Sequence, residues 1–432
     1  MERLMQYIWQ HRLWMPVDMK TVDGRRVQVL DPGRLNTDAG PDFFNAKVII
    51  DGQKWAGDIE IHVRASDWHR HRHDDDPAYR SVILHIVRHD DVAVRRPDGR
   101  LIPQMRMECD PGFHNTYAAL VDKAAAPSLP CAAELHSIEK IHLHGWLDRL
   151  AFERLHAKAD RIERLLSRNN GDWEEACFIT LARALGFGVN SDPFERLAAG
   201  TPLTAIGKHS DSLLSIQAIL FGQASLIPDD TSTDRYADLL KREYEFLAHK
   251  FSLTPIRTPG WKMARMRPAN FPHRRIAFLS AMLLGGFKFM SAITAATNTD
   301  EILSIFNAPL TGYWETHYHF GKESGDLPTM LSLSSKRILA INVAAPILYA
   351  WGIRHNLSQY QDAAISLLQD LPAENNSVVT LFGSAGIKCS DAFTSQAVIQ
   401  LRREYCENHK CLYCRIGHRM LARKATSAST VN

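Results

Sequence analysis

The sequence has few of the features that mark secreted, membrane-embedded or strongly charged proteins. Its first residues, MERLMQYIWQHRLW, include neither a long apolar run nor a small-residue cleavage site, so no secretory signal peptide is expected. No stretch approaches the roughly 18 apolar residues that a membrane-spanning helix needs, so no membrane association is expected. The 51 basic and 48 acidic residues nearly cancel to a formal net charge of +3. Net charge thus neither requires nor excludes a nucleic-acid partner.

Cysteine is scarce and odd in number, which argues against a framework of disulfides. Of seven cysteines in 432 residues, three lie close together in the pattern Cys406-x4-Cys411-x2-Cys414. Thiolates at this spacing favour a zinc ion or an iron–sulfur cluster, and both suit a reducing compartment. We therefore expect a cytoplasmic protein with a structural cysteine knuckle near its C-terminus.

A metal centre at this knuckle needs a fourth ligand, and the sequence offers several. Cys389 lies seventeen residues before Cys406 and is one candidate, while His409 and His418 are nearer to the other thiols. The alternative to a metal is a group of buried thiols, because cysteine buries readily without a functional role. The remaining cysteines, Cys109, Cys131 and Cys177, are scattered and are expected to be packing residues.

The segment from Gly40 to His62, GPDFFNAKVIIDGQKWAGDIEIH, predicts two strands joined by a tight Asp-Gly turn. Along the second strand, aliphatic residues alternate with Asp58, Glu60 and His62, and a period of two places the two sets on opposite faces. Asp42, at the start of the first strand, could then approach Glu60. These neighbouring carboxylates predict a site for Mg²⁺ or Mn²⁺ at Asp42, Asp58 and Glu60. The alternative is an amphipathic hairpin with a solvated acidic face.

Within this hairpin, Pro41-Asp42 followed by Glu60-Ile61-His62 resembles the active-site signature of the PD-(D/E)xK nuclease superfamily. The resemblance implies a restriction-endonuclease-like core that hydrolyses phosphodiester bonds of nucleic acid with a divalent metal at Asp42 and Glu60. His62 replaces the expected lysine. Its imidazole can orient or deprotonate the attacking water but does not supply a fixed positive charge. A degenerate site in a non-catalytic nucleic-acid or protein binding module is the alternative.

A histidine-rich segment follows the hairpin, with His71 and His73 two residues apart and Asp76 three residues further on. In an extended segment, His-x-His points two imidazoles in one direction, which suits Zn²⁺ or Mn²⁺. These three residues are a second set of candidate metal ligands and would support a metal-dependent hydrolase of a small molecule. A solvated surface loop is the alternative. His85 lies within an apolar strand and is either a hydrogen-bonded core histidine or, if its strand neighbours the hairpin, a residue that faces the acidic cluster.

A basic loop between Trp261 and Arg275 combines cations with aromatic residues and prolines. The guanidinium group of arginine can form two parallel hydrogen bonds to a phosphate, and neighbouring aromatic rings can stack on bases. The alternative is a packing loop between helices, whose arginines pair with internal carboxylates. The candidate nucleic-acid-binding residues are Lys262, Arg265, Arg267, Arg274 and Arg275.

The hydrophobic periodicity changes along the chain and predicts an α+β protein. Residues 1–110 read as a short helix followed by strands, which predicts a mixed β-sheet domain with a nuclease-like core. Residues 135–385 carry apolar residues at helical spacing and are expected to form an α-helical domain. Residues 386–423 are expected to hold a C-terminal helix and the cysteine knuckle, and residues 424–432 a disordered tail. The sequence does not predict an oligomeric state.

A wider resemblance extends over nearly the whole chain. Long motifs that include NTDAGPDFFNA (36–46), GDIEIHVRASDW (57–68), RMRPANFPHRR (265–275) and SQAVIQLRREYCENHKCLYCRIGH (395–418) resemble an uncharacterised bacterial protein family, a domain of unknown function. This resemblance implies no activity. The chemistry must therefore be inferred from the residues themselves, and a metal-dependent nuclease is the function that they predict.

Overall fold

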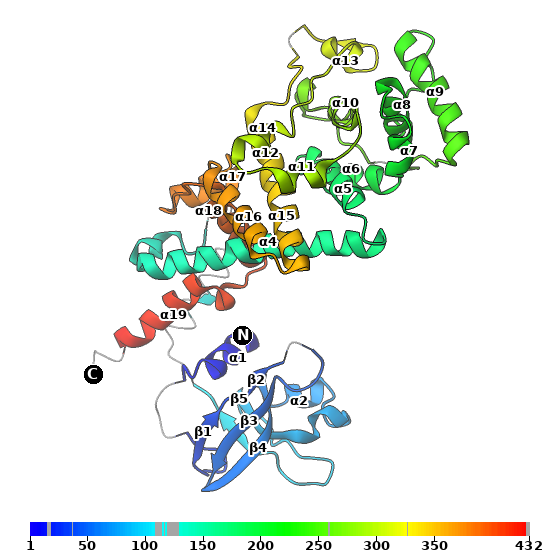
Figure 1. The fold of residues 1–432 in the computed structure, drawn as a ribbon. Coiled ribbons are helices and arrows are strands. Elements are labelled where there is room, and N and C mark those ends of the chain that lie inside the picture. Colours follow the sequence, from blue (N-terminus) through cyan, green and yellow to red (C-terminus); the bar gives the residue numbers. More distant parts are fainter. Residues whose placement is uncertain are drawn as a thin grey trace. The chain divides into compact units, whose positions relative to one another are not determined.

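The chain folds into two compact units (Figure 1). The computed structural model describes residues 1–14, 19–36, 38–108, 115, 117–118, 129–257, 260–325 and 327–428. Unit 1 contains Met1–Trp146, Leu381–Ile387 and Leu401–Asn432, and unit 2 contains Leu147–Thr380 and Lys388–Gln400. The mixed sheet belongs to unit 1, whereas the described part of unit 2 is helical apart from one short hairpin. The predicted α+β class, with an N-terminal mixed sheet and a helical region after it, is therefore confirmed.

The boundaries of the units differ from the expected domains. Unit 1 continues past residue 110 to Trp146 and includes the chain again from Leu401. The C-terminal segment therefore belongs to the same unit as the sheet. The physical reason is packing, because Leu412 and Leu421 lie in the same buried cluster as the N-terminal helix α1 (Glu2–Gln10). Sequence periodicity shows that a segment is amphipathic, but it does not show which distant surface the segment covers.

In the described part of unit 1, six strands form one sheet. They are β1 (Val27–Asp31), β2 (Arg34–Leu35), β3 (Phe43–Ile50), β4 (Gln53–Arg64), β5 (Val82–His89) and β6 (Gln104–Arg106). Their order is β1-β3-β4-β5-β6, with β2 beside β3 (Figure 1). β3 is antiparallel to β1 and β4, whereas β5 is parallel to β4 and β6 is parallel to β5. A crossover must therefore connect β4 to β5.

The predicted hairpin of β3 and β4 forms, and it turns at Asp51 and Gly52. Both turn residues have positive φ, 51° and 84°, as a tight hairpin turn of type I′ requires. The register then pairs Phe43 with Ile59. This pairing places Asp42, just before β3, beside the middle of β4.

Both faces of β4 are buried from Ile59 to His62. Ile59 and Ile61 pack into the core that α1 also joins. Glu60 and His62, on the opposite face, are only 4% and 1% exposed. The alternation of side chains therefore holds as predicted, but the polar face of β4 is covered rather than solvated.

The crossover from β4 to β5 covers this polar face. It contains the short helix α2 (Asp67–Arg70) and the 3-10 helix η1 (Pro77–Ser81), and both pack against β4. Each contributes an aromatic residue to a small buried cluster. His71 and His73 lie between the two helices, so the histidine-rich segment is folded onto the strand that carries the acidic motif.

Unit 2 consists of helices that pack against one another. α4 (Lys140–Arg168) begins in unit 1 and continues into unit 2, and α17 (Ser377–Ser384) crosses back at its end. The other elements of unit 2 are α5 (Trp173–Leu185), α6 (Ser191–Ala199), α7 (Leu203–Gly207), α8 (Leu213–Gln223), α9 (Arg235–Phe251), η3 (Pro268–Asn270), α10 (Pro272–Leu283), α11 (Phe289–Ala295), α12 (Thr299–Ser304), α13 (Tyr313–Thr316), β7 (His317–His319), β8 (Lys322–Glu323), α14 (Leu333–Leu339), η4 (Ala340–Ala344), α15 (Ala345–His355), α16 (Ser358–Asp370) and α18 (Ala392–Gln400).

One helical segment of unit 2 corrects the expectation that no stretch is long and apolar enough to span a membrane. The segment Leu333–His355, which joins α14, η4 and α15, has the length and composition to do so. However, 61% of its most apolar window is buried within the structure. Its neighbours include α5 and α16, so the segment packs as a core helix of unit 2.

The C-terminal part of unit 1 begins with the π-helical turn η5 (Leu401–Cys406) and the 3-10 turn η6 (Cys411–Tyr413). Helix α19 (Arg415–Ala428) follows and extends into the segment that was expected to be a disordered tail. Residues 429–432 of that tail lie outside the described residues.

A candidate metal centre in unit 1

Asp42 and Glu60 are held side by side by hydrogen bonds between their strands. The Asp42 N–H donates to Glu60 Oε2 at 3.0 Å, and the Ile61 N–H donates to Asp42 Oδ2 at 3.0 Å. The side-chain amide of Gln6, from α1, donates to Asp42 Oδ1 at 2.8 Å. These contacts fix the orientation of both carboxyl groups and leave Glu60 Oε1 turned toward the crossover.

Glu60 Oε1 faces two histidines. It lies 3.4 Å from His62 Nε2 and 3.4 Å from His73 Nε2. The His73 nitrogen is buried and has no hydrogen-bond partner among the described residues. An unsatisfied buried nitrogen costs free energy, so protein structures contain few of them without a reason. This nitrogen is therefore available to bind a ligand, because it contacts neither solvent nor a hydrogen-bond partner among the described residues.

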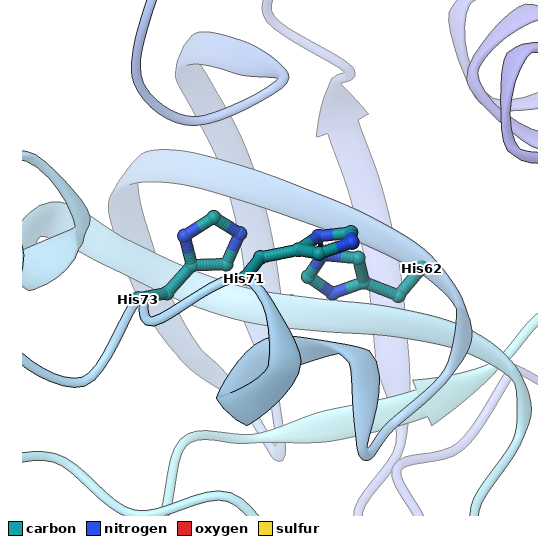
Figure 2. Close-up of side chains that lie close together, drawn as sticks. All are labelled: His62, His71 and His73. Atoms are coloured by element: carbon teal, nitrogen blue, oxygen red, sulfur yellow. Dashed lines mark hydrogen bonds between the residues drawn. The ribbon is translucent and has the colours of Figure 1, made fainter.

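His71 completes the group (Figure 2). Its Nδ1 lies 3.2 Å from His62 Nε2, and one nitrogen from each of His62, His71 and His73 lies within 4.8 Å of the other two. Figure 2 shows the rings of His62 and His71 close together, with His73 beside them. Ligands held at the zinc–nitrogen distance in a tetrahedron stand about 3.4 Å apart. The spacing around Glu60 Oε1 and the imidazoles therefore fits a single bound cation.

A buried chain of side chains fixes which nitrogen of His62 carries the proton. The Gln104 amide donates to Asp90 Oδ1 at 2.6 Å and to a backbone carbonyl, so its Oε1 is the atom that faces His85 Nδ1 at 3.4 Å. His85 Nδ1 then holds a proton, and His85 Nε2 accepts from His62 Nδ1 at 2.9 Å. His62 Nε2 is left with a lone pair that points into the cluster, which is the form that binds a metal.

Burial shifts the titration of these groups in opposite directions. Burial, reinforced by Glu60, raises the pKa of Asp42 to about 7, and burial raises the pKa of Glu60 to about 8. Burial, reinforced by the neighbouring histidines, lowers the pKa of His62 to about 2, and burial also lowers the pKa of His73. His62 and His73 are thus neutral, as metal ligands must be, and a cation would relieve the repulsion between the carboxylates.

Sequence reasoning missed several groups that support this centre. Glu2 of α1 approaches His62 Nε2 at 4.0 Å and is half-buried, and burial raises its pKa. Gln6 from the same helix and Gln104 from β6 hold ligands in place, yet no local pattern ties them to the hairpin. His85 gave the nearest sequence signal, because it was expected to face the acidic cluster if its strand lay beside the hairpin. β5 does lie beside β4 and places His85 opposite Glu60.

Two of the predicted metal ligands lie outside the cluster. Asp58 accepts hydrogen bonds from the Asn45 N–H at 3.0 Å and from the Ser81 hydroxyl at 2.5 Å. Asp76 caps η1 by accepting from the Ala78 N–H at 2.9 Å. Both carboxylates therefore fix the local backbone or a hydroxyl and do not join the histidines.

Two arginines of the predicted nucleic-acid-binding set are buried, which corrects their assignment. Arg274 is 0% exposed and donates to the carbonyl oxygens of Trp314 and Pro328, each at 2.5 Å. Arg275 is 7% exposed, and its guanidinium lies over the Phe187 ring at 4.3 Å. The Arg274 guanidinium thus binds backbone carbonyls of unit 2, and that of Arg275 donates to Asn270 Oδ1, partners that the sequence did not indicate.

The other three cations of the loop, Lys262, Arg265 and Arg267, are exposed. They also belong to unit 2. They keep the basic, aromatic-flanked character on which the nucleic-acid prediction was based.

The cysteines divide between the two units. Cys406, Cys411 and Cys414 lie in unit 1, whereas Cys389 lies in unit 2. Cys131, which was expected to be a packing residue, lines the same cavity as the C-terminal thiols. Cys177 is buried within α5, and Cys109 lies outside the described residues.

Comparison with known proteins identifies a family without an assigned activity. Neither the curated proteins nor the solved structures gave a match to the chain. A family model described as a protein of unknown function, DUF2851, matches residues 2–377, which include the whole candidate metal centre and most of unit 2. The chain therefore belongs to the DUF2851 family.

Proposed function

We propose that unit 1 is a divalent-metal-dependent hydrolase that cleaves phosphodiester bonds in nucleic acid. The observation that carries this proposal is that Glu60 Oε1 lies 3.4 Å from both His62 Nε2 and His73 Nε2. The buried His73 Nε2 has no hydrogen-bond partner among the described residues. A bound cation would satisfy that nitrogen.

The donor set favours Mn²⁺ or Zn²⁺ over Mg²⁺. Mg²⁺ prefers oxygen ligands and keeps several waters, whereas imidazole suits transition metals. Glu60, His62, His71 and His73 would hold the ion, and Asp42 stands beside them through its hydrogen bonds to Gln6 and Ile61. An ion there would supply the positive charge that stabilises a phosphoryl transition state.

The roles of the side chains follow from burial. His62 is 1% exposed and its pKa is lowered to about 2, so it is a poor base at neutral pH. We assign it to metal binding rather than to proton abstraction from water. His71 is exposed, and Glu2 has 39% of its side chain exposed. These two residues border the side of the cluster that water and substrate can reach.

The nucleic-acid substrate is supported by the order of the elements around the site. α1 is followed by antiparallel strands that present Asp42 and Glu60-Ile61-His62, and a crossover then leads to the parallel strand β5. This order is compatible with the restriction-endonuclease-like core that the sequence motif implies. Unit 2 separately exposes Lys262, Arg265 and Arg267, which are cations that suit phosphate contacts.

A second candidate function is the hydrolysis of a small molecule. A cavity of about 270 Å³ borders His73 and is also lined by Trp68, Tyr79, Arg80 and Arg95. That volume is close to the size of small-molecule sites, and the three arginines and three aspartates of its lining suit a polar compound that carries groups of both charges.

The test is a cleavage assay on the full chain. Single- and double-stranded DNA and RNA, together with bis(p-nitrophenyl) phosphate as a small diester, are incubated with Mn²⁺, Zn²⁺, Mg²⁺ or chelator. Glu60→Gln should abolish the metal-dependent cleavage, because it removes the charged ligand at the centre of the cluster. Glu139→Gln is the matched control, because Glu139 is an exposed carboxylate of unit 1 that pairs with His142, and it should retain activity.

The outcomes separate the candidates. Cleavage of polymers with Mn²⁺ or Zn²⁺ that Glu60→Gln abolishes would support the nuclease. Cleavage of only the small diester would support the second candidate. A folded protein that cleaves none of these substrates with any ion, but that binds DNA or RNA in a salt-dependent manner, would contradict both and indicate a binding module.

A further inference from the structure

Four cysteines of unit 1 line one small cavity. Cys131, Cys406, Cys411 and Cys414 border a space of about 20 Å³, and no disulfide joins any of them. We propose that these four thiols bind a structural metal centre, either a zinc ion or an iron–sulfur cluster, with Cys131 as the fourth ligand in place of Cys389. The inference is independent of the hydrolase, because it concerns a different set of residues.

The C-terminal thiols are held by a preformed turn. A Cβ atom on Gly417 would lie 2.1 Å from the Cys411 carbonyl oxygen, so only glycine allows the start of α19 to approach the turn this closely. The His418 N–H donates to the Cys414 carbonyl at 2.8 Å and closes the turn from the other side. Cys411 and Cys414 are therefore positioned by backbone packing rather than by chance burial.

Cys131 joins the knuckle although it is 275 positions from Cys406 along the chain. It lines the same small cavity as Cys406, Cys411 and Cys414, so the fold brings all four thiols to one place. A bound cation would allow all four to ionise there.

The two kinds of centre make different demands on the site. Zinc holds sulfur at about 2.3 Å, which places two ligands on one ion at most about 4.6 Å apart. In the part of the chain that the structure describes, no three of these sulfurs lie within 4.8 Å of one another, a wider spacing that suits a cluster of several irons. The small cavity, in contrast, suits a single ion. Both centres share the same four thiolates, and the experiment below distinguishes them.

The position of the centre assigns it a role in assembly. Cys131 comes from the N-terminal segment of unit 1 and the other thiols come from the segment after Leu401, so a shared ion ties together two segments that unit 2 separates. A link of this kind stabilises the folded state because it reduces the conformational entropy of the unfolded chain. The Tyr7 hydroxyl of α1 hydrogen-bonds His418, so the link also braces the helix that orients Asp42.

The test uses the full chain purified without oxygen. Zinc, iron and acid-labile sulfide are measured per chain, and X-ray absorption at the metal edge reports sulfur ligands. Wild type should contain either about one zinc ion with four sulfur ligands at about 2.3 Å or a stoichiometric iron–sulfur cluster with visible absorption. Cys131→Ser should lose the sulfur-bound metal, and Cys389→Ser, the matched control, should keep it.

Two further measurements keep the proposal falsifiable if Cys131→Ser fails to fold. Cys131→His, which retains a ligand, should keep a zinc ion with three sulfurs and one nitrogen. In wild type, a chelator should release the metal and expose four thiols to a disulfide reagent. Loss of metal in Cys389→Ser but not in Cys131→Ser would overturn the ligand assignment. A folded wild type without sulfur-bound metal, which takes up neither zinc nor iron, would overturn the centre itself.

Discussion

His73 is the residue in which packing and chemistry disagree most clearly. Its ring stacks on Tyr79 with 3.7 Å between the centroids, which suffices to hold a core histidine. Its Nε2 is nevertheless buried, has no hydrogen-bond partner among the described residues, and lies 3.4 Å from Glu60 Oε1. A cation shared with Glu60, as proposed above, would satisfy this nitrogen.

We therefore expect His73→Ala to weaken the binding of Mn²⁺ and Zn²⁺ by more than the roughly 10–100-fold that outer-shell changes cause. The measurement is titration calorimetry on the full chain. His69→Ala is the matched control, because His69 is exposed and pairs with Asp74 at the surface. Equal metal affinity in the two variants would contradict a ligand role for His73.

The buried carboxyl pair predicts how stability depends on pH. In the metal-free protein the pKa of Asp42 is raised to about 7 and that of Glu60 to about 8, from 3.8 and 4.5. A folded state that binds more protons than the unfolded chain loses stability as pH rises through that window. The lowered pKa values of His62 and His73 act in the opposite direction, but only below their usual value of 6.5.

Between pH 7 and 9, the chelated protein should therefore unfold at progressively lower temperature, and Mn²⁺ or Zn²⁺ should weaken or reverse that trend because metal binding favours the ionised carboxylates. Differential scanning calorimetry with chelator and with metal measures both slopes. The double variant Asp42→Asn, Glu60→Gln should flatten the slope of the chelated protein. A chelated wild type whose stability rises over this range would be incompatible with the buried pair.

At the scale of elements, three neighbouring strands carry the hydrogen-bond chain that sets the His62 tautomer. Glu60 on β4 lies opposite His85 on β5, and His85 lies opposite Gln104 on β6. The parallel pairing of these strands thus lines up the chain from Gln104 through His85 to His62. Gln104 is itself oriented by Asp90, so the strand order leaves the His62 Nε2 lone pair free at the proposed metal centre.

Gln104→Leu removes the acceptor for His85 Nδ1 while keeping a side chain of similar length. Without that acceptor, the proton on the His85–His62 pair is free to shift, and we expect metal affinity to fall by about 10–100-fold. Nitrogen-15 NMR of labelled histidines should find His62 protonated at Nδ1 in wild type and a mixture of tautomers in the variant. An unchanged tautomer together with unchanged affinity would show that the chain of hydrogen bonds does not position His62.

Sequence reasoning succeeded where the signal was local. The Asp-Gly turn and the alternation in β4 predicted the hairpin, and the hairpin alone brings Asp42 to Glu60. It failed where a group is supplied from far along the chain. The cover over Glu60 comes from the crossover, and the partners of Arg274 are carbonyls some forty to fifty-four residues away. Cys131 was interpreted as a packing residue for the same reason, because spacing cannot reveal a neighbour 275 positions away.

At the scale of the molecule, unit 1 is discontinuous, and this bears on which part of the chain is needed for function. The family match ends at residue 377, although the segment after Leu401 belongs to the same unit as the sheet. Leu412 and Leu421, 5% and 0% exposed, lie in its main core. The matched region would thus lack part of the hydrophobic core beneath the proposed metal centre.

A chain that ends at Gln400 should consequently lose a stable unit 1. Removing two buried leucines costs roughly 4–10 kcal/mol, which is comparable to the total stability of roughly 5–15 kcal/mol of a typical domain. It also removes three of the four clustered cysteines. We expect this variant to lose Mn²⁺ and Zn²⁺ binding at the histidine centre, although that centre lies entirely within residues 1–400. A chain that ends at Ala428 is the control and should behave as wild type. Retention of metal binding and of the unit 1 unfolding transition by the shorter chain would mean that the C-terminal segment only rests on the sheet, and that the matched region suffices.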